Sequence, residues 1–167
     1  AVFASAVAGL LLLLSWLQNR NVEALALWAA AFMIGSVGVA LISERGNIPD
    51  IWSVVIANAL TSTAYGMMWG GARHFNGRPA PVAFVLAGAV IWLLACQIGA
   101  FPNSPGPRAA LISAIIVAYS VLCAWEFWQE RDDRADRDDA ESHPDPVHQR
   151  VDDDLEARRL RGGLGAV

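Results

Sequence analysis

The polar side chains best suited to chemistry gather in one apolar stretch of the sequence. Asn58, Ser62, Tyr65 and Trp69 lie at positions i, i+4, i+7 and i+11, which is the spacing of one face of an α-helix. We call this set the polar stripe. An unpaired amide is costly in apolar surroundings, so the stripe should point into a helix bundle, where it could line a sensing cavity for a small molecule or a lipid. The alternative role, and the commoner one, is interhelical hydrogen bonding that holds the bundle together.

The other reactive side chains do not form a catalytic or metal-binding pattern. His74 stands alone, and His143 and His148 lie in a hydrophilic stretch without cysteines. Glu126 is the only carboxylate within an apolar stretch, at its very end, where we expect the side chain to reach the aqueous interface. The Gly-rich string at residues 161–165 lacks the Lys and the Ser or Thr of a phosphate-binding loop. We therefore predict no catalytic residue, no metal site and no cofactor.

Five apolar blocks must position these residues. The first would span about 25 Å as a helix, close to the ~30 Å hydrocarbon layer of a bilayer. A helix satisfies its own backbone hydrogen bonds in lipid, and the blocks lack the alternation of barrel strands. The sequence therefore predicts an all-α, polytopic membrane protein with a bundle of five transmembrane helices. The blocks are residues 1–17, 25–42, 51–72, 81–100 and 109–127.

Small residues recur within these blocks at four-residue spacing, which lets helix backbones approach closely. Such pairs serve packing within one chain, and they also serve homodimer formation through transmembrane helices. The sequence leaves both roles open. The pairs are Ala31 with Gly35, Gly66 with Gly70, and Ala95 with Gly99.

The charged residues divide the chain into two parts that suit different solvents. Residues 1–128 hold 5 Arg and 4 acidic residues, whereas residues 129–167 hold 7 Arg and 12 acidic residues. Soluble domains carry roughly 25% charged residues. This chain carries 17%, with 55% apolar residues, which argues against a soluble globular enzyme. We predict a transmembrane bundle over 1–128 and a disordered, acidic and Arg-rich tail over 129–167, and the net charge of −4 does not indicate a nucleic-acid partner.

The placement of arginines predicts the orientation, because cytoplasmic loops carry an excess of basic residues. The loops after the first and third blocks carry Arg20, Arg73 and Arg78, against Arg45 and Arg108 in the other two loops. Three further arginines follow at the start of the tail. We therefore expect a multi-pass protein of the bacterial inner membrane, in contact with the lipid bilayer, with its N-terminus outside and its tail in the cytoplasm.

Four strings carry a family resemblance over about residues 1–130. They are WLQNRNVEALALWAAAFMIGSVGVALISERGNIPD (16–50), IANALTSTAYGMMWGGARHFNGR (56–78), IWLLACQIGAF (91–101) and AWEF (124–127), and the most particular part is W-G-G-A-R-x-F-x-G-R at 69–78. Together they resemble the N-terminal multispan membrane region of bacterial GGDEF-type diguanylate cyclases. The resemblance implies a cytoplasmic output domain in the full-length relative, which condenses two GTP molecules into cyclic di-GMP.

The chain departs from that pattern after Trp128. Its Gly pairs at 70–71 and 162–163 lack the acidic residues that complete a GGDEF turn. We therefore expect no catalytic activity in this form. We hypothesise a truncated or frame-shifted product whose charged tail replaces the rest.

The expected function is an integral membrane sensory or anchoring module, similar to the input region of diguanylate cyclases in cyclic di-GMP signalling. A ligand that prefers one of two helix arrangements would bias such a module. The alternative is a small membrane transporter or a transporter subunit, against which stand the lack of buried charge and of an inverted repeat. A third hypothesis is a structural membrane protein that passes on no signal.

Overall fold

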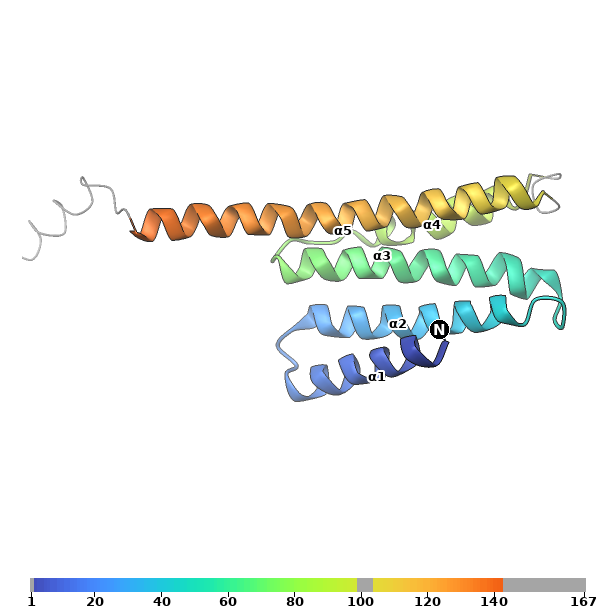
Figure 1. Ribbon diagram of the computed structural model, residues 1–167, viewed down its shortest axis with the longest axis horizontal. Coiled ribbons are helices and arrows are strands. Elements are labelled where there is room, and N and C mark those ends of the chain that lie inside the picture. Colours follow the sequence, from blue (N-terminus) through green and yellow to red (C-terminus); the bar gives the residue numbers. More distant parts are fainter. Residues whose placement is uncertain (1, 99–103, 143–167) are drawn as a thin grey trace, which may run out of the picture. The chain divides into compact units, whose positions relative to one another are not determined.

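The computed structural model describes residues 2–98 and 104–142, and within these ranges the protein is helical (Figure 1). Each predicted apolar block contains a helix, so the all-α class with five α-helices is confirmed for the described residues. The third block begins as a short π-helix, η1. The elements are α1 (Val2–Gln18), α2 (Glu23–Ser43), η1 (Ile51–Ile56), α3 (Ala57–Phe75), α4 (Val82–Ala95) and α5 (Pro105–Ser142).

Two of the described helices, α2 and α5, are long and apolar enough to cross a membrane, judged by length and composition. Helices α1 and α4 are apolar but shorter. The block 51–72 was expected to form one span, and it is divided between η1 and α3. A bundle of five membrane-spanning helices therefore stays a prediction.

The π-helix η1 is held by a tryptophan from α4. The indole Nε1 of Trp92 donates a hydrogen bond of 3.0 Å to the carbonyl oxygen of Val55. Trp92 is fully buried, and no other fully buried side chain in the described residues is as large. Its indole therefore fixes α4 against the start of the third block.

The predicted disordered tail from residue 129 differs from the structure, because α5 continues to Ser142. The sequence there is rich in helix-forming Glu, Arg and Ala. Glu130 and Arg134 add an ion pair one turn apart, with Nε and Oε1 2.9 Å apart. Helical propensity thus continues beyond the apolar block, and residues 143–167 lie outside the described residues.

The chain divides into two units, residues 1–127 and 128–167. Within the first unit, α2 packs between α1 and α3, and α3 packs against α4 (Figure 1). The interface between α2 and α3 is built from small residues: a Cβ added at Gly38 would lie 2.8 Å from Thr61 Oγ1 and 3.0 Å from the Ala57 carbonyl oxygen. The helix backbones can approach this closely only because no larger side chain stands between them.

The small pair Gly66 and Gly70 packs within the chain. A Cβ at Gly66 would clash with the carbonyl oxygen of Val85, and one at Gly70 would lie 3.2 Å from the Val85 side chain. Both glycines therefore face α4 and bring it close to α3. Ala31 is buried and Gly35 faces Ala64 of α3, whereas Gly99 lies outside the described residues.

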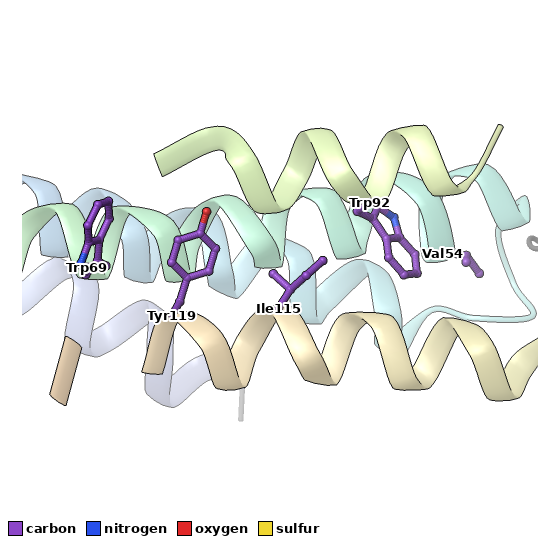
Figure 2. Close-up of a cluster of buried hydrophobic side chains, with 5 residues drawn as sticks. All are labelled: Val54, Trp69, Trp92, Ile115 and Tyr119. Atoms are coloured by element: carbon purple, nitrogen blue, oxygen red, sulfur yellow. The ribbon is translucent and has the colours of Figure 1, made fainter. Parts of the chain in front are cut away.

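Helix α5 meets α3 and α4 through larger side chains. A cluster of buried residues lies between these helices, and Figure 2 shows Ile115 and Tyr119 pointing from α5 towards the others. The inward positions of α5 follow a spacing of three and four residues, which is one face of a helix. They are Ile112, Ile115, Tyr119, Cys123 and Glu126.

Candidate functional site

The polar stripe is only partly assembled into a site. Asn58 Nδ2 donates a 2.7 Å hydrogen bond to the Val54 carbonyl oxygen one turn earlier, so this amide is satisfied by its own helix. Ser62 is fully buried, and its hydroxyl has no hydrogen-bond partner in the described residues. Tyr65 is half-buried against the core. Of the four residues, Trp69 alone lines the cavity between α3, α4 and α5.

This cavity has a volume of about 490 Å³ and an almost entirely apolar lining. Phe84 and Ile91 line it from α4, and Ile115 and Leu122 line it from α5. Arg73, in the last turn of α3, is the only charged side chain among its lining residues. Apolar cavities of this size with one well-placed polar group are typical of small-molecule sites.

Tyr119 forms one wall of the cavity and is built into the backbone of α4. Its hydroxyl donates a 2.7 Å hydrogen bond to the Phe84 carbonyl oxygen and accepts one of 3.0 Å from the Gly88 amide. These two backbone groups are the partners of a regular i→i−4 helix bond, so the hydroxyl bridges them. A Cβ at position 88 would lie 2.7 Å from the tyrosine ring, which explains why glycine is needed there.

Glu126 lies near the cavity, and the expectation that it reaches an aqueous interface is wrong. The residue is only 4% exposed. Its Oε1 lies 2.8 Å from Arg73 Nη1, and its Oε2 lies 3.4 Å from Arg78 Nη1. Asn76 Nδ2 donates a 2.9 Å hydrogen bond to its carbonyl oxygen. We call these four residues the Glu126 clamp, which ties α5 to the last turn of α3 and to the loop that follows it.

The loop that supplies the clamp is folded by its own sequence. Gly77 adopts a φ of +67°, which glycine accepts without strain. The Arg78 amide donates to the Arg73 carbonyl oxygen at 2.8 Å, and Arg73 Nε donates to the Pro79 carbonyl oxygen at 2.9 Å. The turn therefore places both guanidinium groups beside Glu126.

Two tryptophans, Trp28 of α2 and Trp69 of α3, pack near the end of α3 that leads into this loop. Trp28 Nε1 donates a 3.1 Å hydrogen bond to the Met68 carbonyl oxygen, and a Cβ at Gly71 would lie 2.5 Å from the same nitrogen. The ring of Trp69 lies 5.3 Å from the Arg73 guanidinium carbon, in cation–π range. Residues 69–78 thus pack α3 against its neighbours and position the two arginines beside Glu126.

The clamp was missed because its members are about 50 positions apart in the sequence. A usable signal was nonetheless present in the predicted topology. It places the loop with Arg73 and Arg78 on the same side as the end of the fifth block, where the single carboxylate of the blocks lies. A buried carboxylate needs a cationic partner, and these two arginines are among the candidates on that side.

Other reactive side chains remain apart in the structure. His74 is exposed, with Nδ1 3.9 Å from Glu23 Oε2. Cys96 and Cys123 are free. Within residues 2–98 and 104–142, no group of three or more His, Cys, Asp or Glu side chains is gathered that could hold a metal ion.

No known family model matches the sequence, and neither a curated protein nor a solved structure is similar to it. The resemblance to the membrane region of diguanylate cyclases therefore stays a prediction based on the strings themselves.

Proposed function

We propose that this chain is an integral membrane sensory or anchoring module whose fifth helix passes a signal to the cytoplasmic side. The observation that carries the proposal is the distribution of side chains in residues 2–98 and 104–127. The interior of this unit is rich in Ala, Gly and Ser, whereas large apolar side chains lie on its surface. Small residues between helices and large apolar residues outside suit a bundle whose solvent is lipid.

The exposed apolar side chains are large and occur on several helices. Phe3 of α1 is 87% exposed, Leu94 of α4 is 64% exposed, and Trp125 of α5 is 59% exposed. Soluble monomers rarely expose contiguous apolar patches of more than a few hundred Å². A bilayer would cover these side chains.

The clamp gives the module a means of output. Glu126 is the last inward-facing residue of α5 in the first unit. Arg73 holds it from the last turn of α3, and Asn76 and Arg78 hold it from the loop that follows. A signal that loosened these contacts would free α5 from α3 and α4 at that level. Such a signal must bind the tight and loose arrangements with different affinities.

The placement in the membrane and the pathway are parts of the same proposal. The arginines of the clamp belong on the cytoplasmic side by the rule that basic loops stay inside. The inner bacterial membrane and the link to cyclic di-GMP follow from the family resemblance. In this proposal the output domain belongs to a full-length relative, and the chain itself carries no catalysis.

The experiment tests membrane integration first. The full chain with a C-terminal fluorescent protein is expressed in bacteria, and its membranes are washed with alkaline carbonate. We expect the protein to stay with the membranes and the reporter to fluoresce, because that reporter folds in the cytoplasm. Release by carbonate would contradict the membrane assignment, and a dark reporter with an active C-terminal phosphatase fusion would reverse the orientation.

Signalling is tested by appending a GGDEF domain to the C-terminus of the full chain and measuring cyclic di-GMP. The double variant Arg73→Gln/Glu126→Gln removes the clamp's closest ion pair together with the buried carboxylate. We expect a changed cyclic di-GMP level, whereas the control Arg134→Gln, outside the clamp, leaves the level unchanged. Equal levels in all three proteins would reduce the module to an anchor.

One of the two arguments against a transporter fails, but the site still does not fit transport. Glu126 is a buried charge, so the argument from a lack of buried charge is wrong. Its charge is nevertheless paired at the loop end of α3, where it ties helices together. Transport sites use intramembrane charges that line a pathway, and the cavity holds only Arg73.

A further inference from the structure

The cavity between α3, α4 and α5 has a charged end and an apolar end. Arg73 lies at the C-terminal end of α3, and Leu122 lies one turn before Glu126 on α5. Ile115 lines the cavity seven residues before Leu122, which corresponds to about 10 Å along the helix. A ligand that fits must therefore be amphipathic, with its polar group towards the loop after α3.

Arg73 has unused binding capacity at this end. Its Nε donates to the Pro79 carbonyl oxygen, and its Nη1 pairs with only one oxygen of Glu126, because the other oxygen faces Arg78. The remaining nitrogen, Nη2, has no partner in the described residues. A guanidinium binds a phosphate or carboxylate best through two parallel hydrogen bonds, and here the second donor is vacant. The side chain is 26% exposed, so an anion can reach it.

The preceding turn of α3 carries a further unsatisfied donor. Trp69 lines the cavity beside Arg73, and its indole Nε1 is buried without a hydrogen-bond partner. Buried donors are normally satisfied, and an exception calls for a partner that the chain itself does not supply. Trp69 and Arg73 therefore each carry an unsatisfied donor, one turn apart on α3.

We propose that this cavity binds one acyl chain of an anionic phospholipid, with the lipid phosphate at Arg73. The volume of about 490 Å³ suits one chain and not a whole two-chain lipid. Phe84 lines the cavity and is also 62% exposed, so the opening reaches the outer surface of the bundle. A bilayer lipid can insert one chain there and leave the other outside. Basic pockets between helices on the cytoplasmic side suit such headgroups.

The lipid would act on the clamp, a consequence that rests on the proposed sensory function. A phosphate at Arg73 competes with Glu126 for the same guanidinium. Because Glu126 holds α5, the occupancy of the cavity biases the attachment of that helix. The anionic lipid content of the membrane is then the signal.

The binding test uses the full chain purified in a mild detergent and analysed by native mass spectrometry. Phosphatidylglycerol, phosphatidylcholine or oleate is added in equal amounts. We expect one phosphatidylglycerol to be retained per chain, with at least about tenfold preference over phosphatidylcholine, because one charge-assisted pair accounts for such a factor. Equal retention of phosphatidylcholine overturns the role of Arg73, and preferential retention of oleate overturns the phospholipid assignment.

Two variants with a matched control locate the binding. Ala118→Phe fills the cavity from α5, whereas Ala114→Phe places the same ring one turn away at an exposed position that does not line it. We expect Ala118→Phe and the double variant Arg73→Gln/Glu126→Gln to lower phosphatidylglycerol retention about tenfold and Ala114→Phe to leave it unchanged. Equal retention in all three variants overturns the site.

The outcomes separate this inference from the proposed function. A chain that stays in carbonate-washed membranes but retains no phosphatidylglycerol contradicts the lipid site alone. A chain released by carbonate contradicts the membrane assignment, whatever it binds in detergent. Helix content measured by circular dichroism checks that each variant is folded.

Discussion

The two sides of α3 are packed by opposite means. Towards α2, glycines let the two helix backbones approach closely, and a single added methyl group at Gly38 would press on backbone. Towards α5, the contacts are made by Trp69, Ile115 and Tyr119, with a cavity and a buried ion pair among them. On the α2 side the backbones are too close to shift, whereas the α5 side contains a cavity and a buried ion pair. Function is therefore expected on the side of α5.

The largest effect should come from breaking the ion pair of the α5 side. Arg73→Ala leaves Glu126, which is 4% exposed, with only the longer contact to Arg78. Loss of one partner of a buried pair costs about 3 kcal/mol or more of unfolding free energy. Chemical denaturation in detergent micelles measures this loss.

The companion variant separates charge from packing. Adding Glu126→Gln to Arg73→Ala removes the uncompensated carboxylate, so most of the lost stability should return. If the double variant is as unstable as Arg73→Ala, the cost comes from the missing side chain and the ion pair contributes little.

The next effect should come from the α2 side. Gly38→Ala puts a methyl group 2.8 Å from Thr61 Oγ1 and 3.0 Å from backbone, and we expect a loss of about 1–3 kcal/mol. Gly35→Ala is the matched control, because its nearest contact would be an ordinary 3.4 Å to Ala64. Equal melting temperatures for the two variants would contradict the tight packing of α2 against α3.

A smaller effect is expected at the tyrosine bridge. Tyr119→Phe keeps the ring and removes the hydroxyl that joins the Phe84 carbonyl oxygen to the Gly88 amide. These two groups are the partners of a regular helix bond and do not depend on the hydroxyl, so the loss should be only about 1 kcal/mol. Unfolding of the variant alongside the wild type measures it, and a loss several times larger would mean that α4 cannot close its own hydrogen bond.

The smallest effect is expected within the polar stripe. Ser62→Ala removes a fully buried hydroxyl that has no partner in the described residues, so stability should be unchanged or higher by less than about 1 kcal/mol. A clear loss in thermal unfolding would show that the hydroxyl makes a bond after all. The stripe would then contribute to the interior as the sequence spacing suggested.

Parts of the site could be predicted from residue types alone. Trp69 was expected to face inward, and it is buried at the cavity. Asn58 and Ser62 share its helical face, yet Asn58 bonds to its own backbone and Ser62 bonds to nothing described. Spacing fixes which side chains share a face, but the neighbour across that face decides whether they form a site.

By itself, the sequence determined that each apolar block contains a helix, because blocks bounded by charge, Gly and Pro allow little else. It also determined that the blocks expose large apolar side chains, since they contain too few polar residues to cover them. Only the tertiary structure decided that Glu126 pairs with Arg73 and Arg78, and that Tyr119 and Trp69 enclose a cavity with them. Those contacts join residues about 50 positions apart, and no local periodicity encodes which helix faces which.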